Sequence, residues 1–332
     1  MKKLIYLFLA LTIVACSDDN GSSEQSSCPI YLDTNGVTIK ACEDAEVYST
    51  GVINGITYTV VNEIVLRDMI ENGDDVSKVV TTKVTDMSNL AFSFTFNQDI
   101  SSWDVSNVTN MEEMFRSTPF NQPLDNWDVS SVTNMYYMFR NTEFNQSIGD
   151  WDVSNVTNMS FMFQNAYYFN QPLDNWDVSN VTDIEGMFLQ AYAFNQPLDN
   201  WDVSNITDMY YMFNQATAFN QSIGDWDVSN VTNMSFMFQE AESFNQPIGN
   251  WDVSNVTNMR YMFRDATAFN QTIGNWDVSN VNNMYYMFFD ATSYNQDISS
   301  WSVANVGSCD YFSYNAPLTE SNTPNFTICN PN

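Results

Sequence analysis

Tryptophan recurs in this chain at nearly constant intervals. The steps between consecutive tryptophans are 24 residues twice and then 25 residues six times, through Trp103, Trp127, Trp151, Trp176, Trp201, Trp226, Trp251, Trp276 and Trp301. Removing one tryptophan side chain from water contributes up to roughly 4–6 kcal/mol. The spacing therefore predicts a structure in which every repeat buries one tryptophan, and repeats of this length are typical of solenoids.

Each tryptophan belongs to a longer motif in which two periodicities of apolar residues occur. An aromatic-Asn-Gln triplet and a Leu or Ile precede it, as Phe144 and Ile148 precede Trp151. Apolar and polar residues then alternate from Trp151 to Val153, which predicts a short half-buried strand. Further on, apolar side chains recur at the spacing of one helix face: Met159, Met162, Phe163 and Ala166.

These periodicities predict an α/β solenoid with one short parallel strand and a short helical arc in every repeat. In one copy, Thr182-Asp-Ile-Glu185 matches a helix capping box. The Asn of each triplet suits a ladder in which every side-chain amide bonds the backbone of the next coil. One repeat cannot fold alone, because its few buried side chains do not offset the entropy of ordering it. The array must therefore be continuous and capped at both ends.

The flanking segments have the signatures of caps. Asn35-Gly36 and Asn54-Gly55 predict two hairpins, within residues 31–40 and 47–61, and a helix is expected from about Glu63 to Glu71, closed by Gly73. Val84-Thr-Asp-Met87 begins a half repeat. We expect a leader in residues 1–15, a tether in 16–27, an N-terminal cap in 28–81, the repeat array in 82–315 and a C-terminal cap in 316–332.

The first residues predict a lipid-anchored protein. Lys2 and Lys3 precede an apolar run that is too short to span a bilayer, and the run ends in Ile13-Val14-Ala15-Cys16. Small residues before a cysteine are similar to a lipobox, in which Cys16 becomes the lipidated N-terminus; an ordinary secretory signal with a chance cysteine is the alternative. The acidic Ser17-Asp-Asp resembles a tag that directs lipoproteins to the outer surface. The expected location is the outer membrane, facing the cell exterior.

Four cysteines remain once the leader is removed. Cys28 and Cys42 flank the first hairpin almost opposite each other, and Cys309 and Cys329 flank the C-terminal cap. A secreted chain favours two disulfides, each contributing roughly 2–4 kcal/mol. Metal binding by thiols so far apart in sequence is the less favoured alternative.

The charge balance and the missing histidine exclude several functions. The chain has 40 acidic and 10 basic residues, a net charge of −30, and 44% hydrophobic residues. Such a surface repels nucleic acid and anionic lipid, so the lipid anchor is the expected membrane contact. There is no histidine, which removes the usual general base. No nucleophile elbow or phosphate-cradling glycine loop is present either. We expect no catalysis and no obligatory cofactor.

The repeated pattern Phe-Asn-Gln-x-[Leu/Ile]-x-x-Trp-Asp-Val-Ser-x-Val-Thr-x-Met-x-x-Met-Phe resembles that of the BspA-like family of bacterial leucine-rich-repeat surface proteins. The resemblance covers about residues 82–315, and the stretch from Tyr31 to Met87 resembles the N-terminal cap of lipid-anchored members. It implies a right-handed solenoid on the cell surface, with adhesion to host or matrix proteins proposed for some members. No catalytic residues are carried over.

The residue after each tryptophan forms an acidic column. Stacked carboxylates ~4.8 Å apart repel one another by ~0.9 kcal/mol per pair in water. Either each one accepts hydrogen bonds within its own turn, or the column binds Ca²⁺ through its oxygens. The candidate calcium ligands are Asp152, Asp177, Asp202, Asp227 and Asp252.

A second column lies ten residues after each tryptophan, opposite the expected helical core face. Six of its positions are aromatic: Tyr137, Phe161, Tyr211, Phe236, Tyr261 and Tyr286. An exposed aromatic row is typical of a contact surface for protein or sugar. The alternative is that the rings stack from coil to coil and shield the arc.

These features predict a monomeric, surface-displayed binding module or adhesin for protein ligands. A glycan-binding or purely structural envelope component is the alternative, since aromatic side chains suit sugars as well as proteins. The Asn-Val-Thr sequons, as at Asn155, are interpreted as turn chemistry in a bacterial chain.

Overall fold

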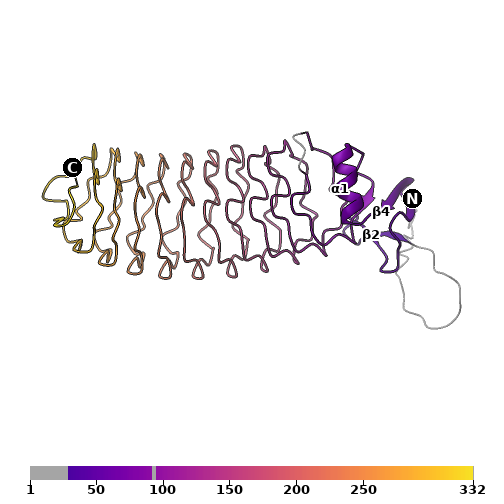
Figure 1. Cartoon of the computed structure of the whole chain (residues 1–332), viewed down its shortest axis with the longest axis horizontal. Helices are drawn as coiled ribbons and strands as arrows, with labels where there is room; N and C mark the ends of the chain where they lie inside the picture. Colours follow the sequence, from indigo (N-terminus) through magenta and orange to yellow (C-terminus); the bar gives the residue numbers. More distant parts are fainter. Residues whose placement is uncertain (1–28, 92–94, 332) are drawn as a thin grey trace, which may run out of the picture.

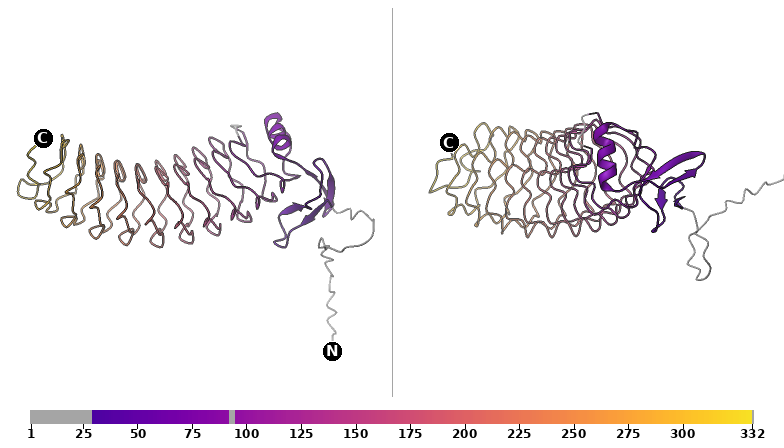
Figure 2. Two further views of the ribbon diagram at one scale, coloured as in Figure 1. Left: turned by 60° about the horizontal axis from the view of Figure 1, so that its bottom comes forward. Right: turned by 45° about the vertical axis from the view of Figure 1, so that its right-hand side comes forward.

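The computed structural model describes residues 29–91 and 95–331. After a small N-terminal unit, the chain winds in successive coils that lie side by side along the long axis of the molecule (Figure 1). Turned views show the same stack, which curves gently from one end to the other (Figure 2). Residues 24 or 25 positions apart therefore become neighbours in space.

The N-terminal unit contains the helix and named strands of the described chain. Strands β1 and β2 form one antiparallel hairpin, β3 and β4 form another, and β5 pairs in parallel with β4. The elements are β1 (Ile30–Leu32), β2 (Ile39–Ala41), β3 (Thr50–Ile53), β4 (Ile56–Val60), α1 (Glu63–Asn72) and β5 (Val79–Val80).

The local turn and cap chemistry produces these elements as predicted. The two hairpins are centred on Asn35-Gly36 and Asn54-Gly55, where Asn54 has φ 51° and Gly55 has φ 80°. Asn62 caps α1 by accepting the N–H of Val65, and Gly73 ends the helix with φ 75°. The predicted hairpins and helix are confirmed.

The N-terminal unit covers the first tryptophan coil. The N–H of Ile39 in β2 donates to the carbonyl of Ser102 at 2.9 Å. The indole Nε1 of Trp103 donates to Val76 O at 3.0 Å, and Thr82 Oγ1 donates to a carboxylate oxygen of Asp104 at 2.6 Å. These bonds give hydrogen-bond partners to backbone and indole groups that would otherwise be buried without any at the start of the stack.

All nine tryptophans are buried, with 0 to 4% of each residue exposed. From Trp127 onward each indole N–H also crosses to the preceding coil, where it donates to a Leu or Ile carbonyl, as Trp151 does to Leu124 O at 3.0 Å. That carbonyl accepts the backbone N–H of Trp127 at 3.1 Å as well. One carbonyl therefore accepts two hydrogen bonds, one that closes a turn of its own coil and one from the indole of the next coil.

Two phenylalanines per coil form the densest part of the core. Within one coil the rings of Phe163 and Phe169 lie 4.0 Å apart and nearly parallel. Phe163 also lies 5.8 Å from Phe188 in the next coil, and both interplanar angles are below 15°. Tryptophan rings of neighbouring coils are parallel but further apart, 6.5 Å between Trp127 and Trp151. The phenylalanines make the close ring stacks, and the indoles supply the hydrogen bonds.

The predicted strand at Trp151–Val153 is wrong in position. Parallel pairing between coils is observed, but as isolated bridges seven residues after each tryptophan, such as Asn158 with Asp183. The tryptophan segment lies between two tight turns instead, in which Trp151 N–H donates to Ile148 O and Val156 N–H to Val153 O. These turns curve the backbone, so it does not extend along its neighbour.

The predicted helical arc is also wrong, because the described residues of the array contain no helix. The capping box predicted at Thr182 is wrong for the same reason. Alternate backbone N–H groups donate to the next coil, as Phe161 does to Glu185 O. The N–H groups between them donate to the carbonyl three residues earlier and close short turns, as Gln164 does to Phe161 O. Phe161 has φ 55°. Left-handed residues and inter-coil bonds are incompatible with an α-helix.

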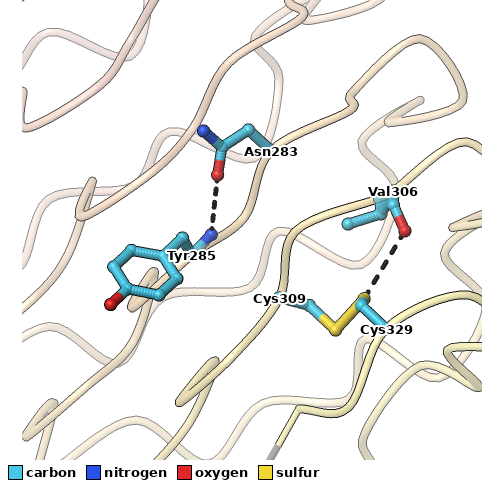
Figure 3. The surroundings of a disulfide bond; sticks show 5 residues. All are labelled: Asn283, Tyr285, Val306, Cys309 and Cys329. Carbon is cyan, nitrogen blue, oxygen red and sulfur yellow. Dashed lines mark hydrogen bonds between the residues drawn. A yellow bond between two sulfur atoms is a disulfide. The ribbon is translucent and has the colours of Figure 1, made fainter.

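A disulfide closes the C-terminal end of the stack. Cys309 and Cys329 are bonded with their Cα atoms 5.7 Å apart, and Cys329 Sγ lies 3.4 Å from Val306 O (Figure 3). The rings of Phe312 and Phe326 meet edge to face at 5.0 Å. This predicted disulfide is confirmed.

The other predicted disulfide cannot be followed in the same way. Cys42 is buried, and its N–H donates to Pro29 O at 3.1 Å. Cys28 lies outside the described residues, as do Cys16 and the leader. Within residues 29–91 and 95–331, no helix has the length and apolar character needed to cross a bilayer.

We expect Trp201→Phe to lower the free energy of unfolding by about 1–3 kcal/mol, because it removes the indole N–H bond to Leu173 O and leaves a void. Urea denaturation followed by circular dichroism measures the change. Tyr192→Phe, at a side chain that is 41% exposed, is the control. An unchanged midpoint for Trp201→Phe would contradict the central role of the indoles.

Reduction of Cys309–Cys329 should loosen the last coils selectively. A disulfide with this separation, 20 residues, stabilises by about 2–4 kcal/mol. Hydrogen exchange with and without reductant should show faster exchange in residues 301–331 and unchanged exchange in coils around Trp201. Equal acceleration along the whole stack would show that the C-terminal cap controls the entire array.

Candidate binding surface

Each coil contains two left-handed positions, and one of them is usually aromatic. The position ten residues after tryptophan has φ between 55° and 61° at all six predicted aromatic residues: Tyr137, Phe161, Tyr211, Phe236, Tyr261 and Tyr286. We call these residues the aromatic face. Left-handed geometry costs roughly 1–2 kcal/mol for a residue with a side chain. Four residues later, the second left-handed position is polar, as at Asn165 and Gln215.

The rings of the aromatic face are half-buried instead of fully exposed, which corrects the prediction of an exposed row. They stack from coil to coil: Phe236 lies 4.6 Å from Tyr211 on one side and 4.6 Å from Tyr261 on the other. Tyr261 lies 5.2 Å from Tyr286. The coil-to-coil stacking foreseen as the alternative is therefore present, while part of each ring remains accessible to solvent.

The face is interrupted once, at Gly186. A Cβ on this residue would lie 2.3 Å from the ring of Phe161, which occupies the space of the missing side chain. The same coil departs from the repeat at Asp183, and within the described array the series of parallel bridges has a gap between Asp183 and Asp208. Burial raises the pKa of Glu185, with Asp208 and Asp183 adding to the effect. Carboxylates gather where the coil-to-coil pairing is weakest.

All basic residues after Lys83 lie on or beside this face. From residue 84 onward the sequence contains no lysine and four arginines: Arg116, Arg140, Arg260 and Arg264. Arg140 lies over the ring of Tyr137 with 4.6 Å between guanidinium and ring centre, and Arg260 lies over Phe236 at 4.9 Å. Such contacts hold a guanidinium in place without neutralising its charge.

The four arginines differ in their ionic partners. Arg116 is paired with Glu113 at 2.7 Å, and Arg264 with Asp265 at 3.0 Å. Arg140 and Arg260 have no carboxylate within ion-pair distance among the described residues, and the Nε of each is buried without a hydrogen-bond partner. Two positive charges on the aromatic face are therefore left without a local counter-charge.

A groove of about 610 Å³ lies on the aromatic face beside the interruption. Its walls come from four consecutive coils and combine rings, amides and guanidinium groups. They consist of Leu189, Gln190, Tyr211, Asn214, Gln215, Phe236, Gln239, Arg260, Tyr261 and Arg264. The volume is within the usual range of small-molecule sites.

The amides of the groove form a directed hydrogen-bond network. Gln190 Nε2 donates to Gln215 Oε1 at 2.6 Å, and Gln215 Nε2 donates to Glu240 Oε2 at 2.9 Å. Asn214 donates to Gln239, which in turn donates to Glu240 Oε1 at 3.0 Å. Each oxygen of Glu240 thus accepts one amide N–H, and among the described residues Glu240 forms no ion pair with Arg260.

Two phenols of the groove are held in the protonated state. Burial, with a hydrogen bond from the Tyr211 hydroxyl to Tyr210 second, raises the pKa of Tyr211 to about 12, and burial likewise raises the pKa of Tyr261. The positive charge of Arg260 opposes both shifts and therefore lies within electrostatic reach of both phenols. At neutral pH both phenols are protonated and hydrogen-bonded to a neighbouring tyrosine, and each hydroxyl oxygen can still accept a hydrogen bond from a ligand.

The acidic column has a local structural role. In each predicted calcium residue, Oδ1 accepts the N–H of the serine two positions later, at 3.0 Å for Ser204 on Asp202 and for Ser254 on Asp252. The serine bonds lower the pKa of Asp177 and Asp227. Asp152, Asp177, Asp202, Asp227 and Asp252 are all exposed. Among the residues with described positions, no group of three or more acidic or cysteine side chains is arranged to hold a metal ion.

Two asparagine ladders also run along the stack. Asn145 Oδ1 accepts the backbone N–H of Asn170 at 3.0 Å, as expected for the triplet asparagines. The sequon residue Asn155 donates to Ser130 O at 2.7 Å, which agrees with turn chemistry. A third set bonds within its own coil, as Asn283 Oδ1 does with Tyr285 N–H (Figure 3).

Sequence reasoning did not identify the arginines of the face or the amide network. Their common position relative to tryptophan, nine or thirteen residues after it, is visible in the sequence and could have been used. It also missed Tyr167, Tyr168 and Tyr192, exposed at the position where the longer repeats gain a residue. Tyr167 and Tyr192 stack at 5.1 Å.

One protein family model matches the chain over three overlapping segments, residues 62–149, 141–226 and 216–326. Its description is "Mycoplasma protein of unknown function, DUF285". The segments cover the array and α1, so the family is one of tandem repeats. Among curated proteins, none matches the chain.

In the acidic column Oδ1 of each aspartate already accepts a serine N–H, which explains the column without a bound ion. We expect the same melting temperature in chelator and in millimolar calcium, measured by scanning calorimetry on the full chain in detergent. A rise of several degrees with calcium would instead support the column as a calcium site, because binding to the folded state alone stabilises it.

Proposed function

This chain belongs to the DUF285 family, and we propose that it is a non-catalytic binding module displayed on the cell surface by a lipid on Cys16. The lipobox-like leader and the acidic residues after Cys16 support a lipid anchor in the outer membrane. The stacked coils support a leucine-rich-repeat-like solenoid, and the repeated motif supports kinship with BspA-like surface proteins. We propose that the module acts as a monomer.

The observation that carries a binding role is the aromatic face itself. Glycine or asparagine would satisfy a left-handed position at lower cost, and the second such position of each coil is polar. Large rings at Tyr211, Phe236 and Tyr261 instead line a groove. Half-buried rings and arginines are the side chains that contribute most to molecular recognition.

Catalysis is not part of the proposal. The chain contains no histidine, and most of its carboxylates recur in equivalent environments, whereas acid–base pairs need unlike ones. Glu240 accepts amide hydrogen bonds on both oxygens. This carboxylate organises the groove.

The ligand is an extracellular macromolecule. A long, half-apolar face suits a protein, which is the class expected first from the sequence. A carbohydrate is the second candidate, and the amide and phenol hydrogen-bonding groups in the groove favour it. Both would be bound without any change in the core of the stack.

Replacing Tyr211, Phe236 and Tyr261 together with serine should abolish ligand capture, because it removes three groove walls and leaves the buried indoles and phenylalanines untouched. The measurement is binding of the full chain in detergent to an array of matrix proteins and glycans. We expect at least a tenfold loss of signal for the ligands that the unmodified chain captures.

The matched control changes Asp202, Asp227 and Asp252 in the same three coils to asparagine. This variant retains an acceptor for each serine N–H and lies outside the groove. It should bind as the unmodified chain does. Unaltered capture by the serine variant, with its coils still folded by circular dichroism, would remove the aromatic face from the proposal.

A further inference from the structure

We propose that the groove between Leu189 and Arg264 binds a carboxylate-bearing carbohydrate, with the carboxylate at Arg260 and the hydroxyls on the neighbouring amides and phenols. The proposal rests on the binding role above and specifies the ligand class. It concerns this groove alone, and it does not require the rest of the aromatic face to contact ligand.

Arg260 is the cation that a ligand carboxylate can reach. Its guanidinium lies 4.9 Å from the ring centre of Phe236, a contact that positions it and leaves its charge uncompensated. Its Nε is buried, as are those of Arg140 and Arg264, so a ligand carboxylate must be bound by the outer nitrogens of the guanidinium. A planar carboxylate matches the paired donors of a guanidinium.

Arg260 forms no ion pair with a carboxylate among the described residues. Glu240 accepts Gln215 on one oxygen and Gln239 on the other. Asp265 is paired with Arg264 at 3.0 Å. The net charge of −30 repels anions overall, so binding of an anionic ligand depends on the local positive charge of Arg260.

The rest of the groove suits sugar hydroxyls. Tyr211 and Tyr261 retain their hydroxyl protons, and three glutamines and one asparagine offer both donors and acceptors. The amides are held by one another, so they bind a ligand with little loss of side-chain entropy. Apolar ring surface beside polar groups matches the mixed character of a sugar ring.

The same groove is poorly suited to an extended acidic peptide. Peptides bound in extended form add their main chain to a free backbone edge. Here the backbone N–H groups already donate within the stack: Tyr211 to Ser235, Phe236 to Arg260 and Tyr261 to Tyr285. A ligand must therefore be recognised by side chains, which favours the carbohydrate.

Isothermal titration calorimetry of the full chain in detergent tests the assignment with three probes: a hexamer of galacturonic acid, its methyl ester and a hexamer of glutamic acid. We expect the galacturonate to bind, the ester to bind at least about tenfold more weakly, and hexaglutamate to bind more weakly than galacturonate. Binding should weaken with added salt.

Arg260→Gln should reduce galacturonate affinity by about tenfold or more, since it removes the charge and retains an amide. Arg116→Gln is the matched control: Arg116 is paired with Glu113 and lies outside the groove, so affinity should be unchanged. Equal urea midpoints for both variants show that folding is preserved.

Three results would overturn the assignment. They are equal affinity for acid and ester, an unaffected Arg260→Gln variant, and tighter binding of hexaglutamate than of galacturonate. If no uronate binds while the serine variant still loses capture of a protein ligand, this inference fails and the binding role stands. If capture is also unaffected by the serine variant, both fail.

Discussion

The indole-to-carbonyl hydrogen bond between neighbouring coils is the interaction on which the rest of the structure depends. Each Leu or Ile carbonyl accepts its own tryptophan N–H and the indole of the following coil, as Ile148 does with Trp151 and Trp176. This arrangement satisfies a buried polar group, closes a turn and sets the position of the next coil. A repeat unit therefore has no complete set of bonds until another lies beside it.

The same requirement for neighbours explains the arc on the opposite part of each coil. Alternate backbone N–H groups donate to carbonyls of the next coil instead of their own. The arc is therefore a series of short turns with two left-handed residues. Side chains at those positions project in register along the stack. A column of rings and a column of polar groups result, and the groove lies beside the point where the column of rings is interrupted by Gly186.

The proposed groove depends on residues that differ from coil to coil. Identical coils would produce a uniform face, whereas Gly186 interrupts the column of rings and the variable positions beside it place Leu189, Arg260 and Arg264 in or next to the groove. The gap in the bridge series between Asp183 and Asp208 lies in the same region.

The sequence by itself determined the buried tryptophans, the 24- and 25-residue units, both N-terminal hairpins, α1 and the Cys309–Cys329 disulfide. These features depend on local turn chemistry and on burial, and both can be predicted from residue types and their spacing. Only the tertiary structure decided the backbone of the arc and the position of the parallel bridges. A spacing of three and four residues satisfies a helix and a chain of short turns equally well, and the choice depends on hydrogen bonds to coils 25 residues away. For the same reason the stacking of Tyr211, Phe236 and Tyr261 and the isolation of Arg260 emerged only when the coils were placed side by side.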